Sequence, residues 1–206
     1  MHKEILSLNQ LDLLPLVRQF IREYYLVGGT AIALHIGHRR SIDFDLFTYD
    51  ALKPKSIITQ IEAENYTYNI TRRVSEQMNI TINDVKFTFF QYPFKIDAKR
   101  KFEDVLRLPE LIDLAAMKAY ALGRRSKWKD YVDLYFLLKD HYSAEQIIQR
   151  GNEIYGQLFS GKLFRAQLSY FEDIDHSEDI EYLTPADPDE EIKSFLVDRA
   201  TDVDLM

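Results

Sequence analysis

Residues 25–47 read YLVGGTAIALHIGHRRSIDFDLF, and this stretch decides the predicted fold. It contains an apolar run that ends in Gly28 and Gly29, a helix-compatible segment at 30–36, a basic turn, and an alternating segment at 42–47. The pattern predicts a strand, a glycine turn, a short helix and a second strand.

Apolar and acidic side chains alternate strictly in residues 42–47. A period of two predicts a strand that turns Ile42, Phe44 and Leu46 toward a core and places Asp43 and Asp45 together on the opposite face. Neighbouring carboxylates repel and raise each other's pKa, and a divalent cation relieves this repulsion. Carboxylate oxygens suit Mg²⁺ or Mn²⁺, which in turn suit phosphate substrates.

The glycine pair supplies a second part of a phosphate site. Because Gly28 and Gly29 lack Cβ atoms, main-chain N–H groups at the start of the following helix can come close to a phosphate. We expect the hydroxyl of Thr30 to add a donor.

Glycine pairs alone are usually turns, and an Asp-x-Asp alone is usually a solvated face, but their combination at helix-length spacing is more specific. It resembles the polymerase-β-like nucleotidyltransferases, and GGTAIALHIGHRRSIDFDLF resembles the AbiEii-type nucleotidyltransferases, which include toxins of type IV toxin–antitoxin systems. The resemblance implies an NTP substrate, a separately encoded antitoxin, and an acceptor hydroxyl on RNA, for example tRNA, or on protein.

Composition indicates a packed globular chain. The 206 residues are 46% hydrophobic and include 13 Tyr and 13 Phe, but no Cys, which excludes disulfides and thiolate metal sites. No segment reaches eighteen consecutive apolar residues, so we expect a soluble cytoplasmic protein without membrane contact.

Charge is unevenly distributed. Residues 172–206 hold 13 acidic and 2 basic side chains, whereas the first 171 residues hold 20 and 24. We expect a solvated, mobile or loosely docked tail, with a short helix at 190–200; self-inhibition through a basic cleft is the alternative.

The remaining pattern predicts an α/β (α+β) fold, in which a mixed-sheet nucleotidyltransferase core is followed by a helical part. Predicted helices cover 7–23 and 54–63, and strands cover 66–74 and 78–91 with a turn at Asn83-Asp84. Helical periodicity dominates 109–123, 127–138, a segment capped by Ser143, and 162–171. We therefore expect a core at 1–98, a helical domain at 99–171 and the acidic tail at 172–206.

A second polar cluster lies in MKAYALGRRSKWKDYVDLYFLL. Asp130 and Asp133 share one helix face, and Lys118 and Arg125 precede them. An ordinary salt-bridged helix pair is one interpretation. The alternative follows from the resemblance, because K-x-x-A-x(3)-R followed by D-x-x-D is similar to later AbiEii motifs and implies that the lysine and a later aspartate are catalytic.

One position departs from the resemblance. Polymerase-β-like enzymes generally use a third carboxylate from a neighbouring strand, and the aligned position holds Thr88, which weakens metal binding. The competing interpretation is therefore a nucleotidyltransferase fold that binds nucleotide or RNA with little turnover.

If the site is active, Asp43 and Asp45 hold the metal against the triphosphate, and Asp45 or Asp133 acts as the base. Lys118 neutralises phosphate charge, while Asp130 completes the catalytic set. The predicted phosphate-binding residues are Gly28, Gly29, Thr30, Arg39, Arg40, Ser41 and Arg125.

Overall fold

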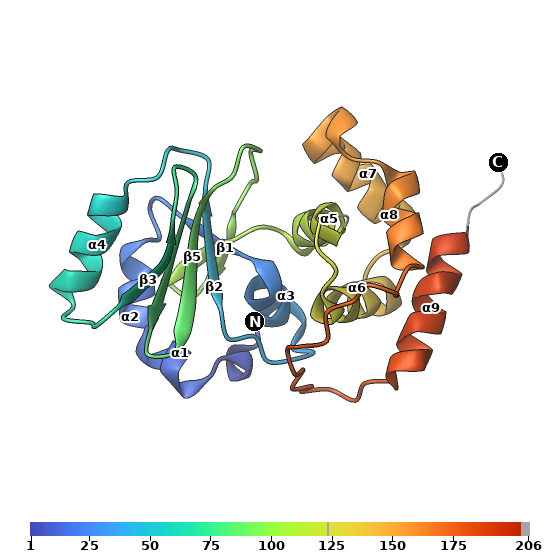
Figure 1. The fold of residues 1–206 in the computed structure, drawn as a ribbon, viewed down its shortest axis with the longest axis horizontal. Helices are drawn as coiled ribbons and strands as arrows, with labels where there is room; N and C mark the ends of the chain where they lie inside the picture. Colours follow the sequence, from blue (N-terminus) through green and yellow to red (C-terminus); the bar gives the residue numbers. More distant parts are fainter. Residues whose placement is uncertain (123, 203–206) are drawn as a thin grey trace. The chain divides into compact units, whose positions relative to one another are not determined.

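The structure is a computed structural model that describes residues 1–122 and 124–202 of the chain. It divides into two compact units, Met1–Glu110 and the residues from Leu111 onward, whose elements are labelled in Figure 1. The expected α/β core followed by a helical part is confirmed. The first unit extends to Glu110, and the described part of the acidic tail falls in the second unit. Gly123, the predicted end of a helix, and residues 203–206 lie outside the described residues.

A mixed five-stranded sheet forms the centre of the first unit. Its order is β1-β2-β5-β4-β3; β2 and β5 run parallel, and the other neighbours are antiparallel. The strands are β1 Tyr25–Val27, β2 Phe44–Thr48, β3 Asn69–Arg73, β4 Gln77–Ile82 and β5 Val85–Gln91.

The predicted hairpin between β4 and β5 is confirmed. Asn83 and Asp84 have φ values of 48° and 61°, and Ile82 pairs with Val85 across the turn. Asn and Asp tolerate positive φ because their short polar side chains bond locally. This turn fixes the β4–β5 register, which also places Thr88.

Helices cover both faces of this sheet. In Figure 1, α2 and α4 lie on one side of the sheet and α3 on the other. The single helix predicted at 7–23 is wrong: Ser7 caps a first short helix through a capping box, and Pro15 opens a second one. The elements are η1 Lys3–Ile5, α1 Leu8–Asp12, α2 Leu14–Gln19, α3 Gly28–Ile36 and α4 Pro54–Ala63.

The sequence did not predict a small hairpin made of β6, Arg100–Phe102, and β7, Leu106–Leu108. Each strand is too short to show a clear alternation. Arg107 on β7 donates from Nε to the carbonyl of Ile21 at 3.0 Å, which ties the hairpin to the first unit. This contact explains why the first unit extends to Glu110.

Aromatic side chains fill the core beneath the sheet. Phe20 meets Phe89 with ring centroids 4.9 Å apart, and Phe44 meets Phe87 at 5.2 Å. Strand β2 begins at Phe44 instead of residue 42, and Ile42 is 55% exposed, so its predicted core position is wrong.

Helices build the whole second unit. The side chains of Tyr131, Leu134 and Tyr135 on α6 are essentially inaccessible to solvent, so this helix forms its centre. Ser143 caps α7 through a capping box with Gln146, as predicted. None of the helices in the described part of the chain has the length and apolar character to cross a bilayer. The elements are α5 Leu111–Leu122, α6 Trp128–Asp140, α7 Ala144–Tyr155, η2 Gly156–Leu158, α8 Gly161–Leu168 and α9 Asp189–Thr201.

The short helix predicted at 190–200 is confirmed as α9, and residues 172–191 are mostly exposed, as a solvated or loosely docked segment would be. Helix α9 buries Ile192, Leu196 and Ala200 against the rest of the second unit. Arg165 of α8 donates to the carbonyls of Arg199 and Ala200 at 2.9 and 3.2 Å, which satisfies acceptors at the end of α9. The apolar spacing of α9 had indicated a helix, but the surrounding acidic charge had hidden its burial.

Candidate active site

The glycine turn and the acidic strand meet directly. Strand β1 ends at Val27, which pairs with Asp45 on β2, and α3 begins at Gly28. Gly28 has φ +73°, and a Cβ atom at this position would lie 2.2 Å from Oδ2 of Asp45. Only glycine fits here, because a side chain would be strained and would overlap the carboxylate. The structure therefore places the Asp45 carboxylate against the backbone at the start of α3.

Asp43 and Asp45 stand on either side of a buried residue. Phe44 is 1% exposed, whereas both aspartates are partly exposed. Asp43 immediately precedes β2 and Asp45 is its second residue. Two carboxylates thus alternate with a core side chain along the chain, as the sequence predicted.

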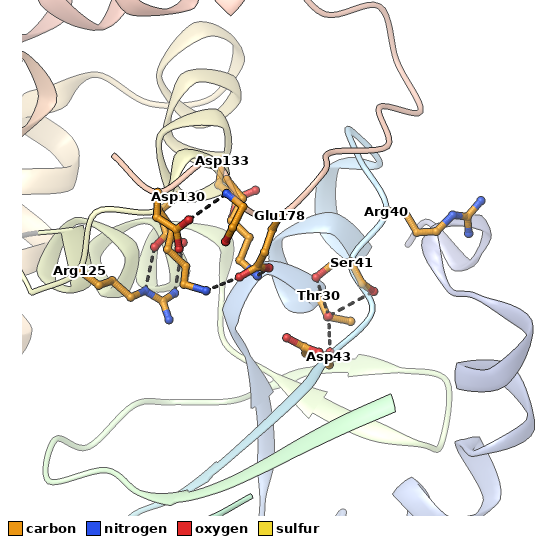
Figure 2. Close-up of polar contacts among 12 residues, drawn as sticks. Thr30, Arg40, Ser41, Asp43, Arg125, Asp130, Asp133 and Glu178 are labelled. Atoms are coloured by element: carbon orange, nitrogen blue, oxygen red, sulfur yellow. Dashed lines mark hydrogen bonds and ion pairs between the residues drawn. The ribbon is translucent and has the colours of Figure 1, made fainter. Parts of the chain in front are cut away.

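Thr30 differs from the expectation that it donates to a phosphate. Its hydroxyl is buried and lies 2.9 Å from Oγ of Ser41, and it also bonds the main-chain carbonyl of Asp43 (Figure 2). These contacts fix the entry to β2. Thr30 and Ser41 therefore position the backbone that carries Asp43.

Arg39 and Arg40 are held in different ways. A Cβ atom on Gly29 would lie 2.5 Å from Nη2 of Arg39, so this buried guanidinium packs beside the first turn of α3. Arg40 donates from Nη1 to the carbonyls of Glu4, Ile5 and Leu6 at 3.1–3.3 Å. Arg39 thus brings positive charge to the glycine pair, whereas Arg40 fastens the N-terminal segment.

The second polar cluster lies between α5 and α6 (Figure 2). Nζ of Lys118 is 2.7 Å from Asp130 and 2.8 Å from Asp133, and Arg125 contacts Asp130 through Nε at 2.8 Å. The side chains of both aspartates are 0% exposed and that of Lys118 is 4% exposed. The four residues that the sequence grouped are therefore brought together in an ion-pair network, in which Lys118 and the two aspartates are buried and Arg125 is about half exposed.

Electrostatics in this network favour the charged form of Asp130. Burial by itself raises the pKa of the Asp130 carboxyl, but the Lys118 ammonium and the Arg125 guanidinium outweigh it. The pKa of Asp130 therefore lies below its ordinary value.

A salt bridge that the sequence did not predict, between Arg150 and Asp113 at 2.6 Å, joins α7 to α5.

Strand register identifies the neighbours of Asp45. Asp45 pairs with Thr88 on β5, and Thr88 pairs with Asn79 on β4. The register thus puts Thr88 beside Asp45 on the neighbouring strand. Asn79 was not predicted from the sequence, because only the β4–β5 register shows that it is the cross-strand neighbour of Thr88.

The acidic pair suits a hard divalent cation. Among the described residues, no group of three or more His, Asp or Glu side chains could hold a metal ion. Mg²⁺, however, commonly takes only one or two carboxylates and completes its octahedron with water and substrate phosphate oxygens. Asp43 and Asp45 fit a cation that is shared with a phosphate-bearing ligand.

Comparison with known proteins identifies the family. Residues 101–202 match the family profile described as "Nucleotidyl transferase AbiEii toxin, Type IV TA system". This match identifies the chain as AbiEii-type over residues 101–202. The match includes the acidic tail, although the resemblance seen in the sequence ended near residue 138.

Solved structures share the fold of this chain at low sequence identity. The nucleotidyltransferase toxin MenT4 from Mycobacterium tuberculosis is 13% identical with a TM-score of 0.62, over 96% of this chain and 84% of that one. JHP933 from Helicobacter pylori is 17% identical with a TM-score of 0.55, over 95% and 91%.

A curated relative is closer in sequence. An uncharacterized protein of Aquifex aeolicus is 31% identical over 126 residues, which cover 58% of this chain and 59% of that protein. The chain thus matches less than two thirds of its relative's length.

Replacing Gly28 by Ala tests the close approach of the turn to Asp45. We expect a larger loss of unfolding free energy than for Gly156→Ala, because Gly156 also has positive φ but has open space where its Cβ would be. Both variants lose about 1–3 kcal/mol through the backbone, and Gly28→Ala loses about 1–3 kcal/mol more through steric overlap. Urea unfolding measures both, and equal losses would contradict the contact.

Replacing Lys118 by Met tests the buried network. We expect a loss of about 3–5 kcal/mol at pH 7, because two buried carboxylates lose their cation, whereas Lys53→Met at an exposed pair with Glu23 costs below about 1 kcal/mol. The folded-state pKa of Asp130 is lowered from 3.8, so the folded state binds its proton less readily than the unfolded state. The stabilisation that the charged Asp130 gives the folded state is therefore fully present above pH 3.8, its ordinary pKa, and is lost as the pH falls through the lower pKa of the folded state.

The difference between wild type and Lys118→Met should therefore narrow as the pH falls below 3.8. Urea unfolding, followed by far-UV circular dichroism at pH 7 and at the lowest pH at which both proteins are still folded, measures this difference in unfolding free energy. A difference that does not change with pH would show that packing, and not charge, accounts for the loss.

Proposed function

We propose that this chain transfers a nucleoside monophosphate from an NTP to a hydroxyl group of RNA, for example a tRNA, or of protein, with Mg²⁺ or Mn²⁺. The single observation that supports this most directly is the approach of the Asp45 carboxylate to the Gly28 backbone, where a Cβ would lie 2.2 Å away. A carboxylate for the metal and a turn for the phosphates are thus adjacent. The family match supports the same reaction class.

In this proposal the first unit binds the triphosphate. Asp43 and Asp45 hold the cation, which offsets the charge that develops on the α-phosphate and on the leaving pyrophosphate. Among the described residues no side chain caps the N-terminus of α3, and its nine residues begin at Gly28. Its first N–H groups, including those of Gly29 and Thr30, then bind the β and γ phosphates, helped by the helix dipole.

The other charged groups have supporting roles. Within the helical unit, Asp130 fixes the position of the Lys118 ammonium through their 2.7 Å contact. Asp45 or Asp133 accepts the proton of the attacking hydroxyl. Arg39, beside the first turn of α3, adds positive charge near the glycine pair.

We also propose a biological setting. The matching family profile is described as a type IV toxin, and MenT4 is described as a nucleotidyltransferase toxin. The chain would then act as the toxin-like component of a toxin–antitoxin system, and its protein partner would be a separately encoded antitoxin.

Thr88 favours a second candidate function. Its register with Asp45 puts a neutral hydroxyl beside the metal carboxylates, so the cation would have one negative ligand fewer than in enzymes with three carboxylates. A nucleotide-binding or RNA-binding regulatory module with little turnover is consistent with this feature.

Label transfer from NTPs tests the proposal. Wild type is incubated with each α-labelled NTP, Mg²⁺ or Mn²⁺, and total RNA or cell extract, and compared with Asp43→Asn and Asp45→Asn. We expect each substitution to reduce transfer by about 10²–10³-fold, the usual effect of removing one group that stabilises transition-state charge. Asp50→Asn, an exposed acid just after β2, is the matched control and should retain activity.

The same samples distinguish the two candidate functions. Transfer that persists in both Asp43→Asn and Asp45→Asn would contradict the metal site. Titration calorimetry with Mg-NTP, combined with an assay for pyrophosphate, separates the alternatives, because tight binding without pyrophosphate release would favour the binding module.

A further inference from the structure

Part of the acidic tail runs along helix α6. We call residues 173–187 the acidic segment. Its Asp175 donates its main-chain N–H to the carbonyl of Ser126 at 2.8 Å, and the carbonyl of Asp175 accepts from the N–H of Trp128 at 3.1 Å. The segment is thus joined to the start of α6 by a parallel β-bridge.

Ion pairs join the acidic segment to both ends of α6. Glu178 bonds to both Lys127 and Lys129 at the N-terminal end, as its place in the close-up of Figure 2 illustrates. Asp187 contacts Lys139 in the last turn at 2.8 Å. Residues 129 and 139 are separated by about 15 Å along a helix. Acidic groups therefore lie over a row of lysines, which we call the lysine row (Lys127, Lys129 and Lys139).

The acidic segment also covers the only tryptophan of the chain. Trp128 is 5% exposed, and the ring of His176 stacks on it with centroids 5.3 Å apart and an interplanar angle of 29°. Movement of the segment away from α6 would remove the His176 ring from one face of this indole. Its fluorescence is therefore a built-in reporter of whether the segment is docked.

The polar contacts of this segment are exchangeable. The side chains of Glu178 and Asp187 are each 42% exposed, and ion pairs at such exposed positions contribute little to stability. Beside the bridge, Asp173 and Asp175 line a cavity of about 520 Å³ together with Arg124 and Lys127, so acidic and basic groups share an open space. A negatively charged polymer that competes for the same lysines could replace these ion pairs one at a time.

We propose that the lysine row is a binding surface for the phosphate backbone of single-stranded RNA, and that the acidic segment occupies this surface until RNA displaces it. The segment is one chain wide, carries its charges at intervals and follows the length of α6, which is how a single phosphate backbone would lie. The acidic tail is then an internal competitor that sets the RNA affinity. The proposal rests on the proposed function for the choice of RNA, but it does not require nucleotide transfer.

Binding of a fluorescein-labelled oligo(U) strand tests the surface without any NTP or metal. Glu178→Gln removes the partner of two lysines, and Asp179→Asn is the matched control, because it removes one negative charge from the next residue, which is exposed and makes no ion pair with any described residue. We expect Glu178→Gln to bind about 3- to 10-fold more tightly than Asp179→Asn at low salt. Its salt slope should be steeper by about 1.4, or about 0.7 for each of two phosphate contacts.

Wild-type protein gives a second readout that does not depend on a variant. Saturating oligo(U) should shift Trp128 emission to longer wavelength and increase its quenching by acrylamide, after correction for absorption with free tryptophanamide. Lys127→Gln combined with Lys129→Gln should remove the gain of Glu178→Gln. Equal binding by Glu178→Gln and Asp179→Asn, absence of oligo(U) binding, or binding with unchanged Trp128 emission would each overturn the proposal. Failure of label transfer alone would affect the proposed function and leave this surface intact.

Discussion

Glycine is the one residue that fits at position 28, and the first unit depends on this constraint. Its φ of +73° and the 2.2 Å that would separate a Cβ from Asp45 allow the chain to turn directly from β1 into α3 beside a carboxylate. Because Val27 and Asp45 are paired in adjacent strands, the approach is fixed by the sheet and not by a flexible loop. A negative group and the positive end of a helix are therefore adjacent, an arrangement suited to a cation shared with phosphates.

The two units satisfy their charges in different ways, and this difference bears on function. In the helical unit, Lys118 lies between Asp130 and Asp133, so opposite charges are paired within the protein. In the sheet unit, Asp43 and Asp45 flank a buried phenylalanine and remain partly exposed, where a cation can reach them. The first arrangement stabilises a helix pair. The second leaves two carboxylates where a cation bound to a ligand can reach them, which is why we propose the metal site there.

Local patterns in the sequence predicted much of this arrangement. Alternation around Asp43 and Asp45, the Asn83-Asp84 turn and the Ser143 cap each depend on neighbouring residues, and each is present. Features that depend on tertiary contacts were missed. The hydroxyl of Thr30 bonds a loop eleven or more residues away, and Arg40 closes the N-terminal segment through carbonyl groups that carry no sequence signal. The tail was judged by its charge alone, although lysines of α6 that pair with it were visible in the sequence.

A crystal structure with Mg²⁺ and a non-hydrolysable NTP tests the central claim most directly. We expect a cation about 2.0–2.1 Å from one carboxylate oxygen of each of Asp43 and Asp45, with the triphosphate against the N–H groups that follow Val27. The same density would show whether Thr88 or a water completes the coordination. A nucleotide bound elsewhere, or a cation that contacts neither aspartate, would contradict the assignment of this site.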